Sequence, residues 1–180
     1  MASAPTTDPR EAQARKLVCN DISVLAPKFG IALRVLLAEA NAQGHDLIAY
    51  ETARSEELQQ LYFAMGRSKA PTVFKSWHGF RLAADLISAE HGWDLWPSWK
   101  WTDADLTQGE WEGGDPSWYE PVITLIHAQG LHWGGDWLHF KDEPHVQWHV
   151  EGMHETPSDN AKALYDAGGY EAVWRAVGAL

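Results

Sequence analysis

A single cysteine, Cys19, stands among the 180 residues, and this limits how the chain can be held together. One thiol cannot form an internal disulfide or a cysteine-rich zinc knuckle. The fold must therefore rest on a hydrophobic core, and hydrophobic residues make up 45% of the chain, enough for one core. If the chain binds a metal, its nine histidines and its carboxylates must supply the ligands.

The organisation of the chain predicts one domain behind a short polar segment. Residues 1–20 read as a polar N-terminal leader and residues 21–180 as a single domain, with no internal repeat and no dividing linker. No apolar run approaches the ~18 residues that a membrane span needs. The first residues also lack the apolar stretch of a secretory signal. We therefore expect a monomer without stable membrane association.

Charge and tryptophan are both concentrated in the second half. Residues 1–90 hold ten basic and ten acidic side chains, whereas residues 91–180 hold four and 15 and so carry the whole formal charge of −11. An acidic surface repels phosphate backbones, which argues against a nucleic acid as partner. Ten of the 11 tryptophans follow residue 90. In the Trp-rich acidic segment 93–118 they are either core and rim residues or a platform for sugar or peptide.

The periodicity of apolar residues predicts helices and a few strands that do not alternate regularly with them. Helices are expected at residues 22–42, interrupted near Pro27, and at 55–65, 116–130 and in pieces beyond 158. Strands are expected over four further stretches: 46–53, 72–78, and the two arms of a hairpin within 131–150. Residues 81–87 fit either type, and residues 92–116 read as a long excursion or irregular hairpin. This order favours an α+β fold.

Histidine and carboxylate side chains recur at spacings that suit a metal site. His78 and Asp85 are seven residues apart, and Asp142 precedes His145 by three. A helix would place the first pair on one face, whereas a strand would need a turn or bulge between them. Hydrolytic zinc takes three protein ligands and leaves one position open, and a separate carboxylate then moves protons. The spacing alone leaves ordinary surface or core residues as the alternative.

The letters around these residues are more specific. The chain contains, in this order, Ser76-x-His78, Ala83-x-Asp85, the Trp-Gly-Gly-Asp-Trp run at 133–137 and Asp142-x-Pro-His145. Together these motifs resemble those of the zinc peptidases that cleave bacterial wall peptides. These are the L-alanyl-D-glutamate endopeptidases, phage endolysins among them, and the D-Ala-D-Ala carboxypeptidases. The resemblance covers residues 45–150. It implies a hedgehog/D-Ala-D-Ala peptidase-like α+β fold, with a small antiparallel sheet flanked by helices.

The resemblance also implies roles for single residues. His78, Asp85 and His145 match the ligands of a catalytic Zn²⁺, and Asp142 matches the carboxylate that activates water. Arg54 matches an arginine that would hold a substrate carboxylate or the developing oxyanion, work that suits its fixed fork of donors. Ser76 matches a small polar residue that would contact the peptide.

Three other residues carry expectations of their own. Arg81 departs from the resemblance, because many members have Gly there, at a backbone position that tolerates no Cβ. Asp136 is expected to accept backbone N–H groups in a tight turn. His149 is the candidate to orient a ligand imidazole.

The implied function is hydrolysis of the L-alanyl-D-glutamate bond in the peptidoglycan stem peptide. A D-Ala-D-Ala carboxypeptidase or dipeptidase is the alternative within the same chemistry. A non-catalytic Trp-rich wall-binding module with a structural zinc is the alternative outside it. As a phage lysin without a signal peptide, the protein would accumulate in the host cytoplasm and act on the cell wall in the periplasm after release.

Overall fold

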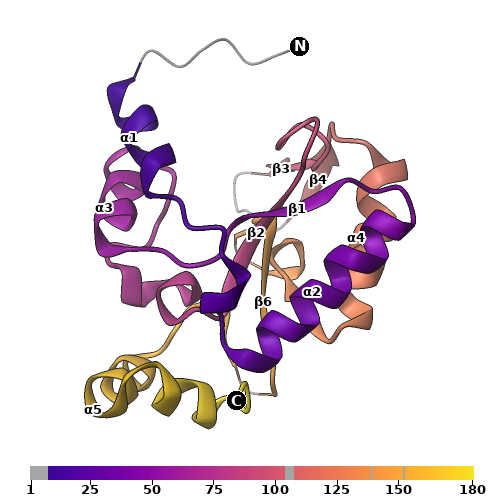
Figure 1. Cartoon of the computed structure of the whole chain (residues 1–180). Coiled ribbons are helices and arrows are strands. Elements are labelled where there is room, and N and C mark those ends of the chain that lie inside the picture. Colours follow the sequence, from indigo (N-terminus) through magenta and orange to yellow (C-terminus); the bar gives the residue numbers. More distant parts are fainter. Residues whose placement is uncertain (1–7, 104–107, 139, 152) are drawn as a thin grey trace.

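The computed structural model describes residues 8–103, 108–138, 140–151 and 153–180, and it has an α+β architecture (Figure 1). The α-helices are α1 (Pro9–Leu17), α2 (Pro27–Ala42), α3 (Glu56–Ala64), α4 (Pro116–Ala128) and α5 (Asp159–Ala176). Short 3₁₀ helices are η1 (Ile22–Val24), η2 (Val73–Lys75), η3 (Trp77–Phe80) and η4 (Gly134–Asp136). The strands are β1 (Leu47–Glu51), β2 (Ala83–Ser88), β3 (Ser98–Trp101), β4 (Gly109–Glu112), β5 (Leu131–Trp133) and β6 (His145–Trp148).

Four of these strands form one antiparallel sheet in the order β1-β2-β6-β5, and β3 pairs with β4 in a separate ribbon. In Figure 1, α2 crosses in front of the sheet, α1 and α3 lie together on one side, and α5 runs along the bottom. The prediction of a small antiparallel sheet flanked by helices is therefore confirmed.

Helices α2 and α4 cover one face of the four-stranded sheet. Helix α2 packs on β1, α4 packs on β5, and the two helices contact each other. Phe29 and Leu33 of α2 are fully buried in one core cluster with Leu86 of β2 and Val146 of β6. Because successive residues of a strand point to opposite faces, the neighbours Asp85 and His145 point away from this core.

The N-terminal segment contains more structure than a polar leader suggests. Residues 9–17 form α1, which Asp8 caps by accepting the N–H of Arg10 at 2.9 Å. The helix packs against α3, and Arg67 forms a 2.6 Å ion pair with Glu11. Its apolar positions are too few to give a clear helical pattern, so the sequence did not reveal it. The division into a leader and a single domain stays a prediction.

Several expected elements are confirmed near their predicted bounds. Strand β1 lies within 46–53, and Ser55 caps α3 by accepting the N–H of Leu58 at 3.1 Å. Helix α2 follows the interruption near Pro27, and α4 ends before Gly130, which has φ 67°.

The strand expected at 72–78 is wrong, because this stretch forms η2 and η3 instead. The two turns fold closely on each other at Gly79, where a Cβ would lie 2.2 Å from the carbonyl oxygen of Val73. Only glycine allows that approach. The run Thr-Val-Phe favours a strand, but the tight turn depends on Gly79, which lies outside that run.

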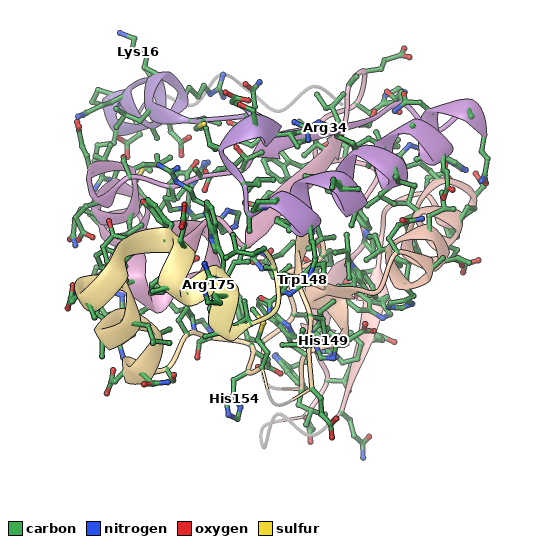
Figure 2. The ribbon with its side chains drawn as sticks, turned by 60° about the horizontal axis from the view of Figure 1, so that its bottom comes forward. Lys16, Arg34, Trp148, His149, His154 and Arg175 are labelled. Atoms are coloured by element: carbon green, nitrogen blue, oxygen red, sulfur yellow. The ribbon has the colours of Figure 1, made fainter. Side chains whose placement is uncertain are left out.

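Helix α5 closes the molecule at the carboxyl end. It is kinked at Gly168-Gly169, where Gly169 has φ 68°, as the predicted break in the tail indicates. Trp148, labelled in Figure 2, donates its indole N–H to the carbonyl of Val177 at 2.8 Å and so ties β6 to the end of α5. Within the described ranges, no helix combines the length and the apolar character that crossing a membrane requires.

The Trp-rich segment forms a packed aromatic group that we call the tryptophan cluster: Trp96, Trp99, Trp111, Trp118 and Trp133. Trp96 and Trp133 are about 95% buried and stack with ring centroids 6.3 Å apart. Trp111 also stacks on Trp133, with ring centroids 5.6 Å apart. For these residues the core-and-rim interpretation is confirmed. Trp93 differs, because it remains 44% exposed.

Candidate metal centre

The centre is built on a row of residues that crosses three strands. Glu51 of β1 lies opposite Asp85 of β2, and Asp85 lies opposite His145 of β6. Residues directly opposite each other in an antiparallel pair point to the same face, so these three side chains meet. A bulge between Ala49 and Glu51 sets this register. Bulges commonly re-aim side chains next to active sites.

His78 reaches the same point from η3, above the sheet. Between His78 and Asp85 the chain turns at Arg81, which adopts a left-handed conformation with φ 61° and ψ 35°. This turn brings the side chains of His78 and Asp85 together despite their seven-residue spacing, since a continuous strand would have pointed them to opposite faces. Arg81 thus occupies a backbone position that favours glycine, as the resemblance implies.

Three donor atoms converge in a nearly equilateral triangle. His78 Nε2 lies 3.1 Å from Asp85 Oδ1 and 3.2 Å from His145 Nδ1, and His145 Nδ1 lies 3.2 Å from Asp85 Oδ1. Tetrahedral zinc with ligands at ~2.0–2.1 Å requires ligand atoms ~3.3 Å apart. The three predicted ligands are therefore brought together at the spacing that a tetrahedral dication needs.

The electrostatics of the buried groups also suit a dication. The two imidazoles hold the pKa of Asp85 well below its ordinary value, although burial opposes this. Burial lowers the pKa of His78. For His145, burial also acts to lower the pKa, but the hydrogen bond with Asp85 and the charge of Asp142 outweigh it and raise the pKa. Burial thus favours the neutral form of His78 that a zinc ligand requires, whereas the carboxylates favour a proton on His145 that a metal must displace.

Asp142 stands beside the triangle without joining it. Its Oδ2 lies 4.0 Å from His145 Nδ1, and its side chain remains 36% exposed. Enclosure in the cavity and the negative charge of Asp85 raise the pKa of Asp142 to about 6, although His145 acts in the other direction. A carboxyl group with such a pKa can both accept and release a proton near neutrality.

The loop that carries Asp142 is fixed by close backbone contacts. The N–H of Asp142 donates to the carbonyl of Gly134 at 3.2 Å, and a Cβ on Gly134 would lie 2.3 Å from the carbonyl oxygen of Asp142. The tryptophan cluster holds the next residue, since Trp133 donates its indole N–H to the carbonyl of Glu143 at 2.6 Å. The backbone N–H of Trp99 donates to the Glu143 carboxylate at 2.9 Å. The Trp-rich segment therefore supports this loop.

A cavity of about 610 Å³ opens over the triangle. Asp142 and Ser76 lie in its lining, together with the three converging side chains and Arg54. Tyr50 and Trp93 form a further wall with ring centroids 4.9 Å apart. Basic residues that line it elsewhere are Arg15, Arg67, Lys69 and Lys75. The volume falls in the range of clefts that take small molecules and short peptides.

Arg54 is more enclosed than a residue that grips a substrate from solvent. Its side chain is 9% exposed, and its guanidinium pairs with Glu51, donates to Gln59 at 3.1 Å and lies 3.5 Å from Asp85 Oδ2. The neighbouring carboxylates raise its pKa against the effect of burial, so it stays charged. Ser76 accepts the N–H of His78 at 3.4 Å and caps η3 at the edge of the cavity.

Two further polar residues contact the centre, and the sequence analysis did not select them. Gln147 Oε1 accepts a hydrogen bond from His145 Nε2 at 3.2 Å, a role that the sequence analysis gave to His149. The ring of His149, which Figure 2 labels near the β6–α5 connection, lies against His132 instead, at 4.9 Å. Glu51 lies 3.7 Å from His78 Nδ1. The signal for Gln147 was available, because residues i and i+2 of a strand share a face.

Asp136 does not belong to the triangle either. Its carboxylate lies 2.8 Å from His127 Nε2 of α4, and no backbone N–H group of the described residues donates to it. The expected contacts within a tight turn are therefore replaced, in the described part of the chain, by a side chain nine residues away.

Comparison with known families agrees with this geometry. A family profile described as D-alanyl-D-alanine carboxypeptidase, of the M15 peptidases, matches residues 69–148, the stretch that holds all three converging side chains and Asp142. Over this stretch the chain is similar to the M15 peptidases. Within it, His78, Asp85 and His145 form the group suited to a metal.

Two curated proteins are similar to this chain. The peptidoglycan L-alanyl-D-glutamate endopeptidase CwlK of Bacillus subtilis (strain 168) is 29% identical over 119 residues, which cover 62% of this chain and 66% of that protein. The L-alanyl-D-glutamate peptidase of Listeria phage A118 is 26% identical over 132 residues, which cover 73% of this chain and 41% of that protein. The chain therefore spans less than two thirds of the length of each.

A solved structure is also similar to this chain. The crystal structure of the Serratia marcescens L-Ala D-Glu endopeptidase ChiX matches with a TM-score of 0.42 and 21% sequence identity. The match covers 78% of this chain and 87% of that chain.

Proposed function

We propose that this protein uses zinc to hydrolyse the L-alanyl-D-glutamate amide bond of the peptidoglycan stem peptide. The observation that carries the proposal is the triangle of His78, Asp85 and His145 donor atoms, 3.1–3.2 Å apart, with Asp142 beside it in one cavity. The choice of bond is supported by the two curated relatives, which are both named for it.

His78 Nε2, Asp85 Oδ1 and His145 Nδ1 would hold the ion. When bound, Zn²⁺ supplies Lewis acidity, which lowers the pKa of a water toward ~7 and polarises the scissile carbonyl. The remaining residues must bind the peptide and move the proton.

Asp142 would move the proton. It lies 4.0 Å from His145 Nδ1, close enough to face the attacking water, and its raised pKa of about 6 suits a group that alternates between base and acid. Asp142 would first accept a proton from the water and then donate it to the leaving nitrogen of D-glutamate.

The lining of the cavity suits an anionic peptide. The chain as a whole has a formal charge of −11, yet away from the metal centre the cavity is lined by four basic residues, Arg15, Arg67, Lys69 and Lys75, against two acidic ones, Glu11 and Glu155. A stem peptide carries free carboxylates, which basic groups attract. Arg54 would add positive charge at the base of the site against the charge that develops on the carbonyl oxygen, and Ser76 would contact the peptide at the edge.

A D-Ala-D-Ala carboxypeptidase is the second candidate, and the description of the matching family profile favours it. That reaction needs a cation to bind the free terminal carboxylate of the substrate. The basic residues of the cavity would serve this purpose equally well, so the products must decide.

Digestion of purified peptidoglycan, followed by mass spectrometry of the new termini, tests the proposal. New D-glutamate amino groups are the expected product, whereas released D-Ala would favour the carboxypeptidase. The Asp142→Asn variant is the matched control: it should bind zinc normally and form product ~10²–10⁴-fold more slowly. Intact stems after digestion with zinc-loaded wild-type protein would favour a wall-binding module and contradict hydrolysis.

We further propose that the protein acts as an endolysin, accumulating in the host cytoplasm and reaching the wall after the membrane is opened. The support is the relative from Listeria phage A118. Expression in a Gram-negative host should leave the culture turbid until chloroform permeabilises the membrane, and lysis should then follow. Lysis without permeabilisation would contradict this location.

A further inference from the structure

Each imidazole of the triangle has a polar side chain near the ring nitrogen that points away from the other two donors. For His145 this is Gln147, whose Oε1 lies 3.2 Å from His145 Nε2. Gln147 has no exposed surface, and its own amide donates to the carbonyl of His154 at 3.4 Å. That bond directs the Gln147 oxygen toward His145 and favours a proton on Nε2, so the neutral ring that binds a metal would present Nδ1 without a proton.

For His78 the corresponding group is Glu51. The Nδ1 atom of His78 is fully enclosed and has no hydrogen-bond partner within normal distance among the described residues. The carboxylate oxygen Oε1 of Glu51 is 3.7 Å away. A buried imidazole N–H without a partner is costly, so an adjacent carboxylate at this position has a clear purpose.

Glu51 is itself held firmly in place. Its side chain is 1% exposed, its Oε1 pairs with Arg54 and its Oε2 accepts the hydroxyl of Tyr62 at 3.1 Å. Arg54 also reaches toward Asp85 Oδ2 at 3.5 Å, so one guanidinium lies between the carboxylate behind His78 and the carboxylate in the triangle. A buried carboxylate is stable only when it is paired in this way.

We propose that Glu51 and Gln147 are positioning residues that fix the two imidazoles in opposite tautomers. Glu51 keeps the proton of His78 on Nδ1, so that Nε2 faces the ion, and Gln147 keeps the proton of His145 on Nε2, so that Nδ1 faces it. Such outer partners orient a ligand and raise its basicity, and their loss typically lowers metal affinity ~10–100-fold. The inference rests on the zinc site of the proposed function, and it assigns Arg54 a second task as the counter-ion of Glu51.

Zinc affinity, measured by competition with a chromophoric chelator, tests the proposal without any substrate. Glu51→Gln should weaken zinc binding ~10–100-fold. Tyr62→Phe is the matched control: it removes one bond to the same carboxylate but leaves its charge facing His78, and its affinity should stay within ~3-fold of wild type. Equal losses in both variants, or no loss in Glu51→Gln, would overturn the proposal.

Gln147 offers an independent test should Glu51→Gln fail to fold. Gln147→Met keeps the volume but removes the acceptor, and it should weaken zinc binding ~10-fold or more. Gln147→Glu restores an acceptor and should recover most of the loss. If Gln147→Met binds zinc as wild type does, the role of Gln147 is refuted.

Tautomers can be read directly from ¹H–¹⁵N correlation spectra of the zinc-loaded protein. We expect His78 to show a protonated Nδ1 and His145 a protonated Nε2, and Gln147→Met to alter only the His145 pattern. Identical tautomers in wild type would refute the assignment. Wild-type protein that fails to bind zinc at all would instead contradict the proposed function, so the two failures are distinguishable.

Discussion

The metal centre and the tryptophan cluster meet at the loop that carries Asp142, yet they are built in different ways. The centre depends on single polar atoms, with three donors held 3.1–3.2 Å apart in a buried setting. The cluster depends on many apolar contacts between rings whose centroids lie 4.8–6.3 Å apart. Loss of a single donor atom can abolish the function of a polar site. In an aromatic cluster, the stabilisation is distributed over contacts with several neighbouring rings. We therefore expect substitutions in the two regions to separate activity from stability.

The largest loss of activity is expected when a residue that would bind the metal is removed. His78→Ala should reduce both zinc binding and hydrolysis to background, because a metal site with two remaining donors no longer fits a hydrolytic zinc. His127→Ala is the control, since it removes an exposed histidine that pairs with Asp136. Zinc content and wall hydrolysis of both purified variants provide the measurement, and hydrolysis retained in His78→Ala would refute the centre.

A glycine-to-alanine substitution adds one Cβ atom, and one glycine in each region allows the metal centre and the tryptophan cluster to be compared in this way. A Cβ on Gly134 would lie 2.3 Å from the backbone of Asp142, whereas a Cβ on Gly109 would lie 2.4 Å from the ring of Trp99. Gly134→Ala should displace the loop and slow hydrolysis ~10²-fold, because small misplacements of catalytic groups have effects of this size. Gly109→Ala should mainly lower the free energy of unfolding, by ~1–3 kcal/mol.

Hydrolysis rates and urea unfolding curves of these two variants give the comparison. Activity per folded molecule should stay within ~3-fold of wild type in Gly109→Ala. If both variants lose activity equally, the tryptophan cluster positions Asp142 as strongly as Gly134 does, and the contrast drawn between the regions is wrong.

Acid should affect the metal centre but not the cluster. Zinc needs a neutral His145, and the hydrogen bond with Asp85 and the charge of Asp142 raise the pKa of His145 despite its burial. As the pH falls below that pKa, a proton competes with zinc, and the affinity should decrease about tenfold for each pH unit and displaced proton. Chelator competition between pH 7.5 and 5.5 measures this. Near-ultraviolet circular dichroism of the tryptophans should remain constant over the same range.

The smallest effect is expected at Arg81, which follows His78 by three residues and lies outside the lining of the cavity. Its left-handed backbone, with φ 61°, is unfavourable for a side chain, but its guanidinium lies 4.0 Å from the ring centroid of Tyr170 in α5. Arg81→Gly removes both effects and should change the free energy of unfolding by less than ~1 kcal/mol. Arg81→Ala keeps the strain and loses the contact, and it should destabilise the protein by ~1 kcal/mol. Thermal unfolding of the two variants checks whether Arg81→Ala is the less stable one. An Arg81→Ala variant that is more stable than Arg81→Gly would contradict the prediction.

The sequence by itself identified the chemistry of the site, because that chemistry requires uncommon residue types in a fixed order. His78, Asp85 and His145, with Asp142 nearby, were selected from their letters and neighbours, and the structure brings them together. The sequence also predicted the α+β class, since strong helical periodicity and turn residues are local properties. Helix α1 was missed because it has few apolar positions, and the turns η2 and η3 were missed because they depend on the close backbone approach at Gly79.

Tertiary structure alone decided which residues support the site. Glu51 comes to lie beside His78 only through the pairing of β1 with β2, and a sequence does not specify that register. The enclosure of Arg54 and the use of the tryptophans to hold the Asp142 loop also follow from contacts between residues far apart in the chain. Residue types fix which reactions a chain can perform, and long-range packing fixes which of those residues can act together.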